Sequence, residues 1–246
     1  MKWKSHAAVT RAVCRAVGMS DYHERIIIGG AIEPDLHPVN VRRGSDMPGR
    51  VAHHGRSDRV INILLWKSRL AFIRGDEEHG CRNLGRALHY VQDKSVSFGR
   101  NLSSHDRLEE EIGEMSVPEM AIEIGLDNAL CSPIYVSECV RSIEPKRDAY
   151  DAIYQATYVS AALTSAVVGT TEATPDLGRE LRRAVILHHY VLSPLAFASA
   201  FIVVALALIS GHLELSALAP VMIGAALVSE WRYRSARKVA QWYGIE

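Results

Sequence analysis

Residues 83 to 93 read Asn83-Leu84-Gly85-Arg86-Ala87-Leu88-His89-Tyr90-Val91-Gln92-Asp93, a helix-favouring stretch that sets a histidine and an aspartate four residues apart. On a helix, residues i and i+4 share one face, with Cβ atoms about 5–6 Å apart. An imidazole and a carboxylate at that spacing can bind one metal ion. A solvated hydrogen bond between the two side chains is the alternative, and the pair alone does not distinguish them.

Other residues of metal-binding types gather in the same part of the chain. His105 and Glu109 repeat the four-residue spacing on a second predicted helix. Zinc accepts neutral imidazoles and carboxylates, and a mixture of them is typical of a catalytic site that keeps a position open for water. Each histidine taken singly could be an ordinary surface or core residue, but the grouping favours a metal site. The remaining candidates are His6, Glu33, Asp35, His53 and His54.

In these motifs the sequence resembles the zinc-dependent phospholipase C family, whose fold is shared with the P1-type nucleases. The resemblance spans roughly residues 3 to 109 and follows the order of the family's motifs. Its specific part is the helical His-x-x-x-Asp of His89 and Asp93, followed by the His-x-x-x-Glu of His105 and Glu109. The supporting elements are the Trp-x-x-His start at Trp3 and His6, the carboxylate Asp35 before a loop, and the His53-His54 pair.

The resemblance implies an all-α, phospholipase C/P1 nuclease-like domain that binds two or three zinc ions (Zn2+). It also implies hydrolysis of a phosphoester, with a phospholipid head group as the expected substrate. The expected ligands form three groups: His53 or His54 with His89 and Asp93 at one ion, His105 with Glu109 at a second, and His6 with bridging Asp93 at a third.

The acid–base role falls on Asp35 by the same resemblance. This carboxylate would act as the base or orient the attacking water, and it is also a candidate metal ligand. Glu33 is the substitute if the loop expected here turns the other way.

The sequence departs from the family at two points. In secreted members the tryptophan is the mature N-terminus and offers its amine to a metal, whereas Trp3 follows Met1-Lys2. The family also places a histidine between the two helical pairs, and residues 94 to 104 contain none. One zinc position is therefore incomplete, filled by another residue such as His37, or empty.

Composition favours a globular enzyme over a nucleic-acid binder. The chain of 246 residues has 28 Lys and Arg against 28 Asp and Glu, so it offers no net basic field to a polyanion. We therefore expect no nucleic acid among its partners. The four cysteines lack metal-binding spacing, which favours buried, reduced thiols. Charged residues interrupt the first thirty positions, so export by a standard signal peptide is not expected.

The pattern along the chain is one helix after another, with no alternating strand pattern of useful length. The glycines and prolines from Gly29 to about Gly55 predict one long irregular segment. The small-residue stretch 149–168 predicts a helix packed inside the protein rather than a membrane span. Other helices are predicted at 7–17, 22–28, 58–74, from 76 through Asp93, at 105 and onward, and after Pro118.

The C-terminal part predicts a transmembrane helical hairpin. Residues 190–209 carry no charge, and about 20 apolar residues match the roughly 30 Å hydrocarbon core of a bilayer. A second, shorter apolar segment covers 215–228. Arginines and lysines flank the pair but are missing from its turn, which places both ends and the catalytic domain on the cytoplasmic side. An apolar hairpin buried in a soluble oligomer is the alternative.

The resulting hypothesis is a metallohydrolase domain at residues 1–172 followed by a membrane-inserting hairpin and basic tail at 173–246. Two other functions stay open. A P1-type nuclease would use the same metals, and a non-catalytic membrane protein could keep an incomplete metal site.

Overall fold

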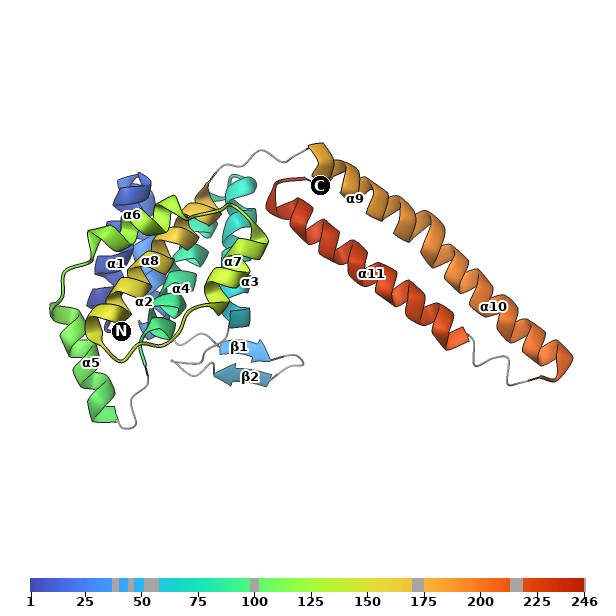
Figure 1. Ribbon diagram of the computed structural model, residues 1–246, viewed down its shortest axis with the longest axis horizontal. Helices are drawn as coiled ribbons and strands as arrows, with labels where there is room; N and C mark the ends of the chain where they lie inside the picture. The colour runs from blue at the N-terminus through green and yellow to red at the C-terminus, as the bar shows by residue number, and fades with distance from the viewer. Residues whose placement is uncertain are drawn as a thin grey trace. The chain divides into compact units, whose positions relative to one another are not determined.

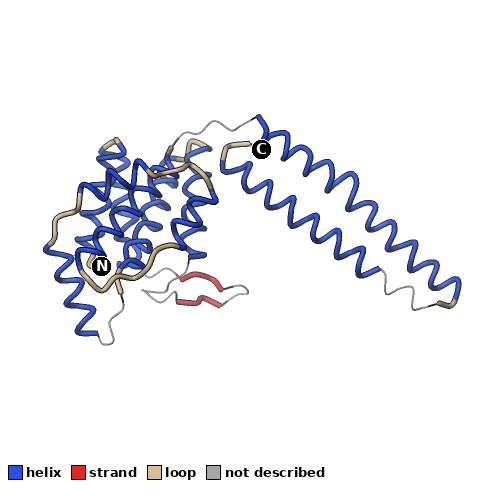
Figure 2. The backbone as a smooth tube through the Cα atoms, viewed as in Figure 1, coloured by secondary structure: helices blue, strands red, loops and turns tan. Residues whose placement is uncertain are grey.

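The computed structural model describes residues 1–36, 40–43, 47–50, 58–97, 102–169, 175–212 and 219–245. The chain divides into two compact units, Met1–Thr170 and Thr171–Glu246. Nearly all of the described residues in both units are helical, as Figures 1 and 2 show, which confirms the all-α class.

The first unit is a helical bundle. Its helices are α1 Trp3–Val17, α2 Asp21–Leu36, α3 Asp58–Ile73, α4 Glu77–Ser95, α5 Leu102–Glu114, α6 Glu119–Asp127, α7 Pro133–Arg141 and α8 Ala149–Val168.

Helix α8 lies inside this bundle, as the sequence predicts. Thirteen of its twenty residues are buried, and it packs against α1, α3, α4, α5, α6 and α7. The Asp148 side chain caps its first turn by accepting a hydrogen bond from the Asp151 amide at 3.0 Å. The small Ala, Ser and Thr side chains let neighbouring helices approach closely, so a composition that resembles a membrane span here belongs to a helix packed inside the bundle.

Helix α4, which carries the His-x-x-x-Asp pair, is the second buried element. It begins after Asp76, whose side chain accepts a hydrogen bond from the His79 amide. Thirteen of its nineteen residues are buried, among them His89 and Asp93. Burying polar side chains costs free energy unless they are paired, so the buried His89 and Asp93 mark α4 as the place to look for a functional site.

Helices α2 and α4 touch backbone to backbone at two glycines. A Cβ atom on Gly30 would lie 2.5 Å from the Arg82 carbonyl oxygen, and one on Gly85 would overlap the Ile27 carbonyl oxygen. This contact brings the C-terminal half of α2 against the face of α4 that holds His89.

The same contact explains why one prediction from the sequence is wrong. Helix α2 does not end before Gly29; it continues through Pro34 to Leu36. Packing against α4 outweighs the low helix propensity of the glycines. Glu33 and Asp35 therefore lie on a helix and not in a loop.

Two short strands also replace part of the expected irregular segment. Strand β1, Asn40–Arg43, pairs antiparallel with β2, Met47–Arg50. A four-residue strand is too short to show a clear alternating pattern in the sequence. Pro48 lies within β2, and proline disfavours a strand prediction.

The second unit consists of two long helical segments. Helix α9, Pro175–Val185, runs through the π-helical segment Ile186–Leu192 into α10, Ser193–Ser210, and α11 spans Ala219–Trp242. One helix, Asp176–Ser210, is long and apolar enough to cross a membrane by length and composition, and 11% of its most apolar stretch is buried within the protein. Part of the expected second span, residues 215–218, lies outside the described residues.

All four cysteines are free, but only two are buried as expected, since Cys131 and Cys139 are half-buried. Cys14 and Cys81 are buried, and burial raises the pKa of each thiol to about 12. Both thiols therefore stay protonated and unreactive near neutral pH.

The glycine contact between α2 and α4 makes a stability prediction. Gly85→Ala should lower the free energy of unfolding by about 1–3 kcal/mol, because the new methyl group overlaps the Ile27 carbonyl oxygen. Gly29→Ala is the control, since Gly29 is exposed on the same helix pair and has open space around it. That change should be neutral or stabilise by up to ~1 kcal/mol. Urea denaturation followed by circular dichroism measures both, and equal effects would contradict the close approach.

Candidate metal centre

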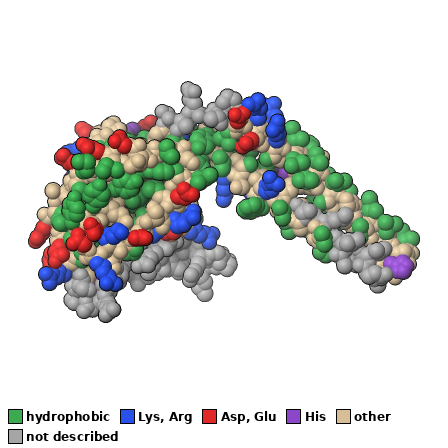
Figure 3. Space-filling model, viewed as in Figure 1, with side chains coloured by type: hydrophobic (Ala, Val, Ile, Leu, Met, Phe, Trp, Pro, Cys, Tyr) green, Lys and Arg blue, Asp and Glu red, His purple; other side chains and the backbone are tan. Residues whose placement is uncertain are grey.

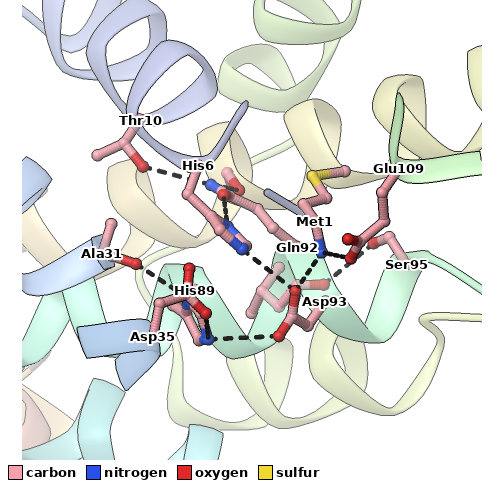
Figure 4. Close-up of polar contacts among 12 residues, drawn as sticks. Met1, His6, Thr10, Ala31, Asp35, His89, Gln92, Asp93, Ser95 and Glu109 are labelled. Carbon is pink, nitrogen blue, oxygen red and sulfur yellow. Dashed lines mark hydrogen bonds and ion pairs between the residues drawn. The ribbon is translucent and has the colours of Figure 1, made fainter. Parts of the chain in front are cut away.

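Helix geometry brings His89 and Asp93 together as the four-residue spacing predicts. The His89 Nε2 atom lies 3.3 Å from Asp93 Oδ2, and the two side chains are 0% and 5% exposed. Figure 4 shows both side chains rising from α4 into the space below α1. A buried imidazole and carboxylate in this arrangement form half of a metal site.

His6 on α1 completes a three-residue cluster. Its Nε2 atom lies 3.2 Å from Asp93 Oδ1, and its ring centroid is 4.3 Å from that of His89. One donor atom from each of His6, His89 and Asp93 lies within 4.8 Å of the other two, and all three residues are buried. Residues 83 positions apart in sequence thus share one site.

Hydrogen bonds on the far side of each ring orient both histidines. The His89 Nδ1 atom lies 2.9 Å from the Ala31 carbonyl oxygen, which can only accept a hydrogen bond, so Nδ1–H donates. The His6 Nδ1 atom lies 2.7 Å from Gln92 Oε1 and donates in the same way. In the neutral form, each ring then presents the lone pair of Nε2 to the cluster. Metal-binding histidines are held by this kind of outer hydrogen bond.

Gln92 is a residue of this site that the sequence motifs do not include. Its Nε2 donates to Thr10 Oγ1 at 3.4 Å and to Ser160 Oγ at 3.2 Å, so its Oε1 is turned toward His6. The side chain is completely buried. A glutamine next to Asp93 on a helix with many buried positions was the available signal.

The ammonium group of Met1 lies inside the same site. Its nitrogen is 2.6 Å from Asp93 Oδ1 and 2.8 Å from Glu109 Oε1. His105 continues the chain of contacts, with Nε2 at 3.3 Å from Glu109 Oε1. Both helical His-x-x-x-acid pairs therefore meet across one amino group, as the dashed lines from Met1 in Figure 4 show for Asp93 and Glu109.

The pKa values of the cluster follow from burial and charge. Burial lowers the pKa of His6 and outweighs the attraction of Asp93, so the imidazole is neutral near pH 7. Burial alone would raise the pKa of Asp93, but the Met1 ammonium and His6 hold it well below its usual value. Burial lowers the pKa of the Met1 ammonium less than the Asp93 and Glu109 carboxylates raise it, so the net pKa is raised. Neutral imidazole and ionised carboxylate are the forms that bind metals.

The two candidate catalytic carboxylates go to different places. Asp35 Oδ1 lies 3.9 Å from His89 Nε2, and the Asp35 side chain is 22% exposed, at the rim of the site. Glu33 turns to the neighbouring helix and pairs with the Arg86 guanidinium, whose Nε donates to Glu33 Oε2 at 2.9 Å. Asp35 and not Glu33 therefore lies beside the cluster.

The other predicted elements of the site lie elsewhere or outside the described residues. Trp3 is 55% exposed and contributes its ring to the surface, while the amino group in the site belongs to Met1. His53, His54 and His37 fall outside the described residues.

The donor set of this cluster fits a zinc-type cation. His6 Nε2, His89 Nε2 and the Asp93 carboxylate are all acceptors when the imidazoles are neutral, and acceptors at 3.2–3.3 Å repel one another unless a cation or proton lies between them. Imidazole nitrogen and carboxylate oxygen are the ligands that zinc takes with an open fourth position. Glu109 and His105 add a second pair of the same types beside it.

This cluster predicts which substitutions remove metal. His89→Ala or Asp93→Asn in the full-length protein should each lower the zinc retained after dialysis by about one ion per chain, because each removes a central donor. His79→Ala is the control, since His79 is exposed on the same helix. Elemental analysis measures the zinc, and circular dichroism checks that the helices persist. Unchanged zinc content in both cluster variants would rule out this site.

No family model, curated protein or solved structure matches the chain. What the protein does is therefore inferred from the residues of the cluster and of the apolar helices.

Proposed function

We propose that this protein is a zinc-dependent phosphoester hydrolase that acts on phospholipid head groups at a membrane. The observation that carries the proposal is the convergence of His6, His89 and Asp93, with the carboxylate of Asp35 at the rim. The resemblance of the motifs to zinc-dependent phospholipases C supplies the reaction type.

Each residue has a defined part in the proposed site. The Nε2 atoms of His6 and His89 bind the cation, held in position by Gln92 and the Ala31 carbonyl. Asp93 offers one carboxylate oxygen toward each histidine, so its carboxylate would help to hold the same cation. Zinc supplies Lewis acidity, which stabilises negative charge on a phosphoryl oxygen and activates water near neutral pH.

A second cation position would use His105 and Glu109. Their side chains are 6% and 13% exposed, and the Met1 amino group links Glu109 to Asp93. A cation there would replace the positive charge that the Met1 ammonium supplies to the two carboxylates. Two cations side by side can stabilise both the attacking and the leaving oxygen of a phosphoryl group.

Asp35 is the proposed acid–base residue. It lies beside the three-residue cluster and combines proximity to His89 with access to solvent. From this position its carboxylate can take a proton from a water molecule or hold that water in line with the phosphorus. Glu33 lacks this freedom because it is bound to Arg86.

The second unit supports a membrane location. Large apolar side chains on α10 point away from the protein: Phe197, Phe201, Leu208 and Ile209 are 62%, 76%, 68% and 84% exposed. Figure 3 shows hydrophobic side chains along the described length of this unit, with Lys and Arg near the end where α9 begins and α11 ends. Exposed apolar area of this extent needs lipid or a large protein interface. We assign α10 and the start of α11 to a membrane-inserted hairpin with its basic end in the cytoplasm.

Catalysis is tested by Asp35→Asn. The amide keeps the shape and loses the charge, so turnover of a soluble phosphodiester, bis(p-nitrophenyl) phosphate, should fall by about 10²-fold or more at unchanged zinc content. Glu33→Gln should stay within a few-fold of the parent because Glu33 faces Arg86. Equal activity of all three proteins would remove Asp35 from the mechanism.

Substrate class is tested with the same preparation. Release of phosphocholine from phosphatidylcholine vesicles supports the lipid reaction, while cleavage of single-stranded DNA alone would indicate a P1-type nuclease. Full zinc content without either activity would indicate a non-catalytic metal-binding membrane protein.

Membrane attachment is tested by ending the chain at Thr170. The shortened protein should be soluble without detergent, keep its zinc and keep its turnover of the soluble phosphodiester, because all described cluster residues lie in the first unit. Its activity on vesicles should fall, because the full-length form gains effective concentration from attachment. Full-length protein that is soluble without detergent would contradict the membrane assignment.

A further inference from the structure

A cavity of about 790 Å3 lies within the second unit, between α9 and α11. Its lining combines two kinds of side chain. Four arginines contribute to it, Arg179, Arg182, Arg183 and Arg237, together with apolar residues that include Leu181 and Tyr233. A cavity with basic and apolar walls suits a ligand that has an anionic part and an apolar part.

Most of the positive charge in this cavity has no carboxylate partner within the described part of the chain. Arg179 pairs with Asp176 three residues earlier on α9. Among the residues that the structure describes, no carboxylate pairs with Arg182, Arg183 or Arg237, and all three are exposed. Three neighbouring guanidinium groups without a counter-charge favour an anion from outside the chain.

A partly buried polar contact between the two helical segments shows where the cavity lies along the hairpin. His188 Nε2 lies 2.5 Å from Glu230 Oε2, and His188 Nδ1 lies 3.0 Å from Ser229 Oγ. The two helical segments run antiparallel, so residues before His188 and after Glu230 share one side of this contact. The cavity residues lie on that side, and the apolar residues of α10 and the start of α11 lie on the other.

Aromatic residues mark the same level. Tyr190 lies two residues after His188 and is 76% exposed. Trp231 lies one residue after Glu230 and is 71% exposed. Exposed tyrosine and tryptophan at the end of an apolar segment are typical of a membrane–water boundary. The arginine cavity therefore lies where lipid phosphates would lie.

We propose that this cavity binds the phosphate of an anionic phospholipid, with the arginines around the phosphate and the apolar wall against the glycerol and upper acyl chains. The inference rests on the proposed membrane insertion of this unit but not on its catalytic activity. Planar guanidinium groups bind phosphate oxygens through two parallel hydrogen bonds. Basic cavities between helices at the cytoplasmic surface suit anionic lipid head groups for this reason.

The test compares two double variants that remove the same charge from the same unit. Arg183→Gln with Arg237→Gln changes the cavity, and Arg232→Gln with Lys238→Gln changes exposed basic residues that do not line it. Full-length protein in detergent is titrated with short-chain phosphatidylglycerol, short-chain phosphatidylcholine or inorganic phosphate, and native mass spectrometry counts the bound ligand. Circular dichroism checks the fold of each variant.

Phosphatidylglycerol should bind more tightly than either phosphatidylcholine or inorganic phosphate. The cavity variant should lose about tenfold or more of that affinity, the scale of a lost charge-assisted contact, while the control variant stays within a few-fold. Equal losses in both variants would mean diffuse attraction and overturn the site. Equal binding of inorganic phosphate and lipid would mean an anion site without lipid recognition, which also overturns the proposal.

Vesicle flotation separates this proposal from the membrane assignment. If the protein floats with phosphatidylcholine vesicles but shows no preference for phosphatidylglycerol in the titration, the lipid site is wrong and the membrane assignment stands. If the protein floats with neither neutral nor anionic vesicles, both are wrong.

Discussion

The buried carboxylate of Asp93 is the constraint on which the first unit depends. An ionised carboxylate at 5% exposure is costly unless positive charge and hydrogen-bond donors surround it. The Met1 ammonium meets part of this need and links the start of the chain to α4. The Nε2 atoms of His6 and His89 lie 3.2 and 3.3 Å from the same carboxylate, so a cation or proton between these groups would complete the charge balance and link α1 to α4. The Ala31 carbonyl then ties α2 to His89. The same cluster that organises the helices has the donors of a zinc site, so the fold and the proposed chemistry share one set of contacts.

The sequence predicts the parts of this arrangement that depend on local geometry. The spacing of His89 and Asp93, and of His105 and Glu109, is enough to place each pair on one helix face, because helical periodicity is a local property. The long, uncharged segment 190–209 likewise predicts a helix. Other parts depend on contacts between distant residues. The continuation of α2 to Leu36 needs the backbone contact of Gly30 with α4, and the pairing of Glu33 with Arg86 follows from it. Neither can be read from a glycine-rich stretch of sequence.

The two units divide the proposed work between them. The first contains every described member of the metal cluster, and the second contains the apolar helices and the arginine cavity. A hydrolase of lipid head groups needs both a catalytic centre and a means of staying at the lipid surface. A cavity that holds an anionic lipid would add a preference for membranes of particular composition to the proposed hydrolase, whose chemistry would depend on His6, His89 and Asp93.

The central claim is that these three residues bind zinc through the Nε2 atoms of both histidines. Anomalous X-ray diffraction at the zinc absorption edge, from crystals of the protein grown with zinc, tests it most directly. The account predicts a zinc peak about 2.0–2.1 Å from His6 Nε2 and His89 Nε2, with an Asp93 oxygen at a similar distance. Crystals that contain zinc only at surface histidines, with the Met1 ammonium still bound to Asp93 and no peak among the three residues, would contradict it.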